Sequence, residues 1–227
     1  MAQRIGFLVN PIAGIGGTVG LKGSDGVVEL AIERGAEPSA NRRAAEMLRA
    51  LNANLAEHPA PPDITWFTCA GVMGEDALRS SGLDEIEVVF RPGTPPGAAD
   101  TREAVRAFIE AGASLVVFCG GDGTARDVCA ETGRTTPVLG VPAGVKMYSA
   151  VFGVSPARSA EILLGYLDGR LGLSEADVLD VDEQAYRAGR LEVRLYDSAR
   201  TCLLYTSDAA DEYIPVLVAG GGGGGVG

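Results

Sequence analysis

Apolar runs of strand length alternate with helix-like segments from residue 4 to residue 169. The expected strands are RIGFLVN (4–10), DITWFTCA (63–70), IEVVFRP (86–92), SLVVFCGGDGT (114–124) and TPVLGVP (136–142). The expected helices cover residues 27–35, 39–58, 74–82, 99–113, 127–134 and 155–169. Continuously apolar strands separated by amphipathic helices are typical of a parallel sheet that is covered on both faces. The sequence therefore predicts an α/β domain over residues 1–175.

The pattern changes after residue 175. The segment ADVLDVDEQAYRAGRLEVRLYDS alternates apolar and polar residues over two short stretches, and RAGR between them reads as a turn. Such alternation is typical of antiparallel strands with one solvated face. We therefore expect residues 176–200 to be the first strands of a β-rich second domain, which is truncated because two strands are too few for an independent sheet.

The last part of the chain, residues 201–227, does not continue this pattern. Residues 202–212, CLLYTSDAADE, resemble one reading frame of a transposon-based sequencing adapter, and a run of six glycines follows at 220–225. We expect an artefactual, disordered tail that has no part in the fold. The alternative is a real strand, YIPVLVA, followed by a flexible glycine linker.

The net charge of −11 argues against a nucleic-acid-binding surface and against binding to an anionic membrane. The chain has no apolar run of about 20 residues and no signal-peptide pattern, so we expect a cytoplasmic protein. Its four cysteines form no C-x-x-C pair, which indicates neither a zinc site nor a disulfide framework. A phosphorylated ligand remains compatible with the charge, because backbone N–H groups bind phosphate locally.

The strongest motif is FCGGDGTARDV, in which an apolar strand ends in a glycine-rich turn before a helix. Glycines at 120, 121 and 123 let backbone N–H groups approach a ligand, and a helix N-terminus favours phosphate. Asp122 then fits a base for an acceptor hydroxyl, or a carboxylate linked to phosphate through a divalent cation. The alternative is a turn in which Asp122 only caps the helix.

Two further glycine-bearing loops follow strands. The segment NPIAGIGGTVGLKGSDG (10–26) contains Asn10, Lys22 and Asp25, and GVPAGVKMYS (140–149) contains Lys146, Tyr148 and Ser149. Ligands of open α/β sheets bind at the carboxyl ends of the strands, so all three loops are expected to converge at one edge. Taken singly, the first could be a mobile surface loop and the second a turn with an exposed lysine.

Other conspicuous residues are expected to have structural roles. Asp100 begins a capping-box pattern, and we favour a helix cap over a ligand contact. His58, the single histidine, is expected to complement a helix dipole at the surface. Three residues are expected in the core: Trp66, Cys69 and Cys119.

The motifs FLVNPIAGIGG, VGLKGSDG, GGDGTARDV and GVPAGVKMYS, in this order, resemble the superfamily of NAD kinases, diacylglycerol kinases and 6-phosphofructokinases. They are most similar to the ATP-NAD kinase family that includes relatives of acetoin-catabolism protein X. The resemblance covers about residues 4–197. It implies a Rossmann-like α/β domain and a β-rich domain, with nucleotide in the cleft between them and a homo-oligomer at full length.

The resemblance also implies a reaction, in which ATP phosphorylates the 2′-hydroxyl of the adenosine ribose of NAD, with Mg²⁺ carried by the nucleotide. Asp122 would be the acid–base or metal-linked carboxylate. The phosphate-facing loop would contain Gly120, Gly121, Gly123 and Thr124. Substrate or phosphate contacts would come from Asn10, Lys22, Asp25, Lys146 and Ser149.

Three functional hypotheses remain open on the sequence. The first is an NAD kinase, and the second is a related kinase that phosphorylates a lipid or a small polyol. The third is a nucleotide-binding fragment without activity. Because the family's second domain supplies much of the dinucleotide pocket, we expect this chain to be inactive by itself.

Overall fold

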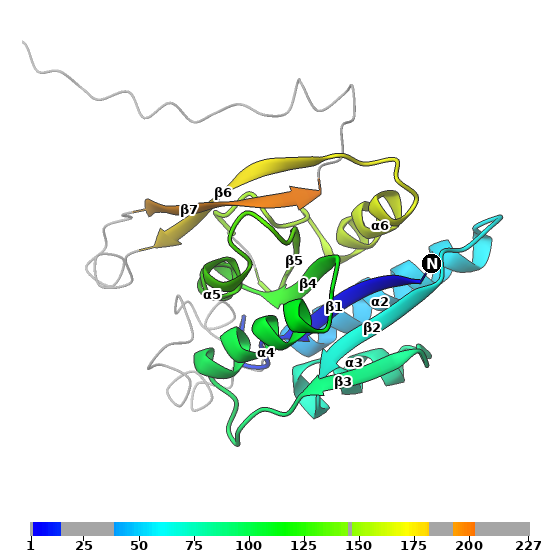
Figure 1. Cartoon of the computed structure of the whole chain (residues 1–227), viewed down its shortest axis with the longest axis horizontal. Helices are drawn as coiled ribbons and strands as arrows, with labels where there is room; N and C mark the ends of the chain where they lie inside the picture. The colour runs from blue at the N-terminus through cyan, green and yellow to red at the C-terminus, as the bar shows by residue number, and fades with distance from the viewer. Residues whose placement is uncertain (1, 15–38, 145–146, 182–192, 203–227) are drawn as a thin grey trace, which may run out of the picture.

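The computed structural model describes residues 2–14, 39–144, 147–181 and 193–202. A central sheet carries helices on both faces (Figure 1). Its strands are β1 (Gln3–Val9), β2 (Ile64–Cys69), β3 (Ile86–Phe90), β4 (Leu115–Gly120), β5 (Val138–Pro142), β6 (Leu173–Val181) and β7 (Val193–Cys202). The helices are α2 (Ala40–Glu57), α3 (Glu75–Ser80), α4 (Ala98–Glu110), α5 (Asp122–Thr132) and α6 (Pro156–Leu167), with a 3₁₀ turn η2 (Gly71–Met73).

The seven strands lie in the order β3-β2-β1-β4-β5-β7-β6. Strands β1 to β5 are all parallel to their neighbours. The chain moves from β1 outward to β3 and then returns to place β4 on the other side of β1. The boundary between β1 and β4 is therefore the topological switch point, beside which open α/β sheets bind ligands. The predicted α/β fold with a parallel sheet is confirmed.

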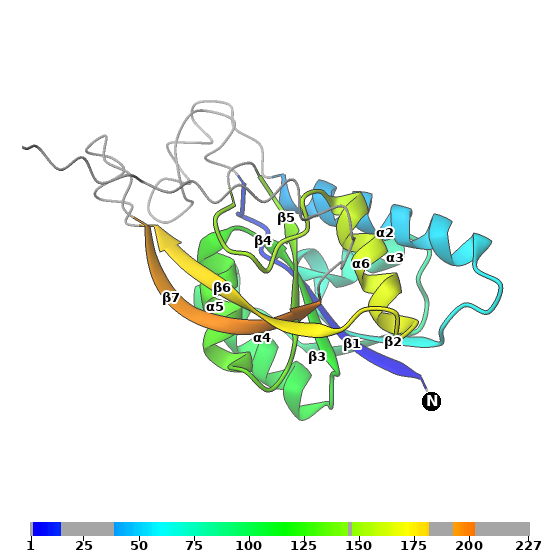
Figure 2. The same cartoon turned by 90° about the horizontal axis from the view of Figure 1, so that it is seen from above.

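Two apolar layers cover the sheet because successive strand residues point to opposite faces. On β1, Ile5 and Phe7 pack with α2, α3 and α6, whereas Leu8 packs with α4 and α5. Figure 2 shows these two groups of helices on opposite sides of the sheet. The three residues predicted to lie in the core are buried there: Trp66, Cys69 and Cys119.

Strand and helix boundaries differ from the predicted ones by a few residues at most places, and by five at α5. That helix begins at Asp122 instead of residue 127, so Asp122, Gly123 and Thr124 of the glycine-rich motif lie in its first turn. Glycine is a weak helix former, which is why the sequence pattern reads this turn as a loop. The helix expected at 27–35 lies outside the described residues.

The β6–β7 pair is antiparallel, as its alternating pattern predicts. It joins the sheet of the α/β domain, because Thr201 of β7 pairs with Val138 of β5. Strand β7 runs to Cys202, so two buried residues of the segment predicted as a tail belong to this strand. The RAGR turn and residues 203–227 lie outside the described ranges. Within those ranges, no helix combines the length and apolarity needed to cross a membrane.

Candidate functional site

The carboxyl ends of β1, β4 and β5 meet at one edge of the sheet, which we call the rim. The backbone N–H of Asn10, just after β1, donates to the carbonyl of Cys119 at 2.9 Å. The N–H of Ala143, just after β5, donates to the carbonyl of Gly120 at 2.9 Å. The beginnings of the three predicted loops therefore converge, as the topology requires.

Asn10 and Thr124 connect two of these loops directly. The Asn10 side-chain amide donates to the Thr124 hydroxyl at 2.9 Å, and its carbonyl oxygen accepts from the N–H of Ile12 at 3.3 Å. The Thr124 hydroxyl also accepts from the N–H of Gly121 at 3.4 Å. Both residues were expected to contact ligand, and both fix the shape of the switch point in this structure.

Asp122 is the first residue of α5, and its carboxylate faces the segment that follows β5. Oδ1 accepts from the N–H of Ser149 at 2.8 Å and from the N–H of Tyr148 at 3.1 Å, while Oδ2 shares the Tyr148 N–H at 3.1 Å. The N-cap position of α5 belongs to Gly121. Asp122 is therefore not the N-cap of its own helix, and its carboxylate instead fastens a second loop to the rim.

The rim glycines differ in what surrounds them. A Cβ on Gly120 would lie 2.4 Å from the Cβ of Thr124, so packing alone requires glycine there. At Gly121 the nearest described atom would be the sulfur of Met147 at 3.9 Å, and at Gly123 no described atom would lie within 4 Å. The first turn of α5 therefore exposes bare backbone, whose N–H groups have no intrahelical partners.

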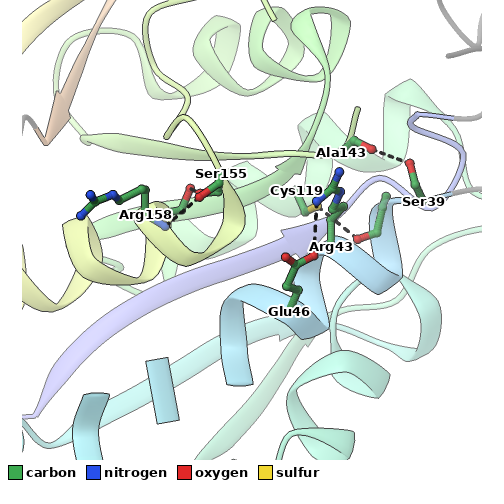
Figure 3. Close-up of polar contacts among 9 residues, drawn as sticks. Ser39, Arg43, Glu46, Cys119, Ala143, Ser155 and Arg158 are labelled. Carbon is green, nitrogen blue, oxygen red and sulfur yellow. Dashed lines mark hydrogen bonds and ion pairs between the residues drawn. The ribbon is translucent and has the colours of Figure 1, made fainter. Parts of the chain in front are cut away.

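The N-terminal end of α2 is attached to the same rim from the other face of the sheet. The hydroxyl of Ser39 donates to the carbonyl of Ala143, and the thiol of Cys119 donates to the carbonyl of Ala40 at 3.2 Å (Figure 3). A Cβ on Gly14, where φ is +80°, would lie 2.5 Å from the Ala143 carbonyl oxygen. Sequence reasoning missed Ser39, although a serine just before a helix is a recognisable N-terminal signal.

Ser149 lies at the rim, but its hydroxyl points to the backbone of β6. This residue is 4% exposed, and its hydroxyl accepts from the N–H of Leu179 at 3.0 Å and donates to the carbonyl of Leu179 at 3.3 Å. Its role in ligand binding stays a prediction. Three other predicted contact residues lie outside the described ranges: Lys22, Asp25 and Lys146.

Asp100 and His58 both have structural partners. The Asp100 carboxylate accepts from the N–H groups of Gly93 and Gly97, each at 2.8 Å, at the start of α4. It occupies the third helical position instead of the N-cap that the pattern predicts. His58 ends α2 and places Nε2 3.3 Å from the Asp168 carboxylate at the end of α6.

The cysteines of the described residues are free and buried. Burial, followed by the charge of Asp100, raises the pKa of the Cys69 thiol to about 12. Burial likewise raises the pKa of the thiols of Cys129 and Cys202 to about 12. None of these thiols is therefore a ready nucleophile. Within the described ranges, no group of three or more His, Cys, Asp or Glu side chains is arranged to hold a metal ion.

Comparison with known families agrees with this geometry. The family model described as "ATP-NAD kinase N-terminal domain" matches residues 5–171, which include all but the first two residues of β1, the whole of β2 to β5 and the described rim. Searches of the curated proteins and of the solved structures found no match.

Proposed function

The chain belongs to the ATP-NAD kinase family, and we propose that it transfers the γ-phosphate of ATP to the 2′-hydroxyl of the adenosine ribose of NAD. In this step the ribose oxygen forms a bond to the γ-phosphorus while the bond to the β–γ bridging oxygen breaks. ADP leaves, and the hydroxyl proton passes to a base. The family identifies the chain as a phosphotransferase, and the choice of NAD, ATP and this hydroxyl is our proposal.

The position of Asp122 is the observation that carries this proposal. Two backbone N–H groups hold Oδ1, while Oδ2 shares only one of them. A carboxylate has about four lone-pair directions, so Oδ2 retains capacity to accept from a substrate hydroxyl. A base within hydrogen-bond reach of the attacking hydroxyl contributes about 10²–10⁴-fold to rate. We therefore assign proton abstraction to Asp122.

The first turn of α5 supports phosphate binding next to this base. Gly121 and Gly123 leave the backbone open, and the helix N-terminus carries partial positive charge toward the rim. Mg²⁺, when bound with the nucleotide, would neutralise charge on the transferring phosphoryl group. Asp122 would offer a carboxylate to that ion, and the nucleotide phosphates would offer further oxygen ligands.

The test measures NADP formation from NAD and ATP–Mg²⁺, together with binding of each nucleotide by calorimetry. Asp122→Asn should reduce turnover by about 10²–10⁴-fold. The matched control is Asp63→Asn, the same chemical change at an exposed position just before β2, at the opposite edge of the sheet. This control should keep the wild-type rate.

The outcomes separate the open hypotheses. Turnover that depends on Asp122 supports the proposal and overturns the expectation that this chain is inactive. Binding of both nucleotides without turnover would support the third hypothesis, a nucleotide-binding fragment without activity. ATP consumption with a polyol or lipid, but not with NAD, would support the second hypothesis, a related kinase with a different acceptor. Absence of both binding and turnover would contradict the proposal entirely.

A further inference from the structure

Residues 147–150 lie between the start of α5 and strand β6, and hydrogen bonds fasten them to both. On one side the Asp122 carboxylate accepts from the N–H groups of Tyr148 and Ser149. On the other side the Ser149 hydroxyl bonds to both backbone groups of Leu179, and the N–H of Ala150 donates to the carbonyl of Asp177 at 2.8 Å. This segment therefore connects the proposed base to the second part of the sheet.

The Ser149 hydroxyl pairs with the backbone of Leu179 in the way that a residue of a neighbouring strand would. A hydroxyl both donates and accepts, so a single side chain satisfies the N–H and the carbonyl of that residue. The β6–β7 register shifts between Val178 and Leu179, which marks an irregularity in the ladder at this point. Because Ser149 is buried, losing its hydroxyl would leave backbone polar groups unpaired, at a cost of about 1–3 kcal/mol.

The same residue contributes its N–H to Asp122, at the shortest of the distances to that carboxylate, 2.8 Å. The position of this N–H depends on the backbone of Ser149, which the bonds to Leu179 fix in place. Holding Oδ1 against a fixed N–H also sets the direction of Oδ2. A misplacement of about 1 Å in a reacting group is enough to cost roughly 10²-fold in rate.

We propose that Ser149 is a positioning residue, which anchors to β6 through its hydroxyl and orients the Asp122 carboxylate through its backbone N–H. It acts on the reaction through Asp122 and makes no contact with the substrate. The expected effect of Ser149 on the reaction rate rests on the proposed function. The hydrogen-bonded connection from Asp122 through Ser149 to Leu179 does not. It also gives β6 a part in the site, through Leu179 and Asp177.

The first test needs no activity and measures hydrogen exchange at individual amides by NMR. Ser149→Ala should accelerate exchange at Leu179, which loses its acceptor, and also at Tyr148 and Ser149 positions, which lose their fixed geometry. Asp122→Asn should accelerate the last two and leave Leu179 protected. The amide of Val117, buried in β4, reports the loss of global stability in each variant, and Leu179 in Ser149→Ala should accelerate by more than Val117 does. Unchanged exchange at Leu179 in Ser149→Ala would overturn the proposal.

The second test separates positioning from stability by kinetics. Ser149→Ala should lower kcat for NADP formation by about 10- to 100-fold and leave KM for ATP within about twofold. Ser149→Thr, which keeps a hydroxyl, should recover most of that loss. The control is Ser155→Ala, which removes the hydroxyl that accepts from the N–H of Arg158 at the start of α6.

Ser155→Ala should lower the free energy of unfolding by about 1 kcal/mol and keep the wild-type kcat. Equal kcat in Ser149→Ala and wild type, or no recovery in a folded Ser149→Thr, would contradict the proposal. A wild-type chain that forms no NADP would remove the proposed function instead, and the amide exchange would still decide whether Ser149 connects Asp122 to β6.

Discussion

Gly120 and Gly123 lie in the same motif, yet their surroundings assign them different tasks. A methyl group on Gly120 would overlap the side chain of Thr124, whereas one on Gly123 would meet no atom of the described residues within 4 Å. We expect Gly120→Ala to lower the free energy of unfolding by about 1–3 kcal/mol. Gly123→Ala should raise it by up to about 1 kcal/mol, because alanine is the better helix former. Urea denaturation of both variants measures the difference.

The same pair of variants tests why glycine occupies position 123. If phosphate approaches the bare backbone of α5, Gly123→Ala should weaken ATP binding although it stabilises the fold. Calorimetric titration of the variant against wild type measures this. A stabilised variant with unchanged ATP affinity would show that the backbone at Gly123 does not contact the nucleotide.

At the level of elements, Asp100 holds the turn that leads into α4. Its carboxylate accepts from the N–H of Gly93, in the loop before the helix, and from the N–H of Gly97, at the N-cap. Asp100→Ala should therefore lower the free energy of unfolding by about 1 kcal/mol, and Asp100→Asn by less because one acceptor oxygen remains. Thermal denaturation gives the ranking. A loss of nucleotide affinity in Asp100→Ala without a loss of stability would favour the ligand contact over the cap.

The Asp168 carboxylate, at the end of α6, contacts His58 at the end of α2 and is paired with Arg170, and its stabilising effect depends on pH. Burial raises the pKa of Asp168, but hydrogen bonds from Arg170 and the charge of His58 outweigh it, so this pKa lies below its ordinary value. A lowered pKa in the folded chain means that the carboxylate stabilises the fold above about pH 4. That contribution disappears as the pH falls through the folded-state pKa.

Asp168→Asn should consequently destabilise the chain by about 0.5–1 kcal/mol at about pH 7. The difference from wild type should shrink toward zero as the solution is acidified below the ordinary range of aspartate. Denaturant titrations of both proteins at a series of pH values measure the difference directly. A gap that grows as the pH falls through the folded-state pKa of Asp168 would show that the sign of this linkage is wrong.

The elements show where sequence reasoning succeeds and where it stops. Local patterns determine the five parallel strands, because a continuous apolar run such as residues 115–120 has few alternatives in a soluble chain. They misplace the start of α5, since tertiary contacts at Asp122 and Thr124 compensate for the weak helix propensity of glycine. The bonds from Asp122 to residues 148 and 149 join positions 26 and 27 residues apart, which no local pattern encodes.

On the scale of the whole molecule, the β6–β7 pair is continuous with the parallel sheet. Thr201 is 1% exposed, and its hydroxyl donates to the carbonyl of Val138 in β5 at 2.7 Å. Ala176 and Val178 of β6, with Ala199 of β7, pack into the same apolar layer as α4 and α5. The division at residue 175 predicted from the pattern thus falls within a shared core layer, which favours unfolding as one cooperative unit.

Two probes at opposite ends of the sheet test this cooperativity. Trp66, the single tryptophan, is buried in β2, whereas β7 lies beyond β5 on the other side. In urea, the fluorescence of Trp66 and the amide protection of residues 199–202 should be lost at the same midpoint. Two separate midpoints would instead show that the β6–β7 pair unfolds independently, as the start of a second domain would.

Thr201→Val adds a perturbation on one side of the molecule that both probes should report. The change keeps the volume but leaves the buried Val138 carbonyl without its donor, so we expect a loss of about 1–3 kcal/mol. Thr201→Ser keeps the hydroxyl and should lose less. If the sheet unfolds as a unit, Thr201→Val lowers the midpoint at Trp66 as much as at residues 199–202, because the energy of a cooperative transition is shared by every residue in it. A shift confined to β7 would place the boundary of cooperativity between β5 and β7.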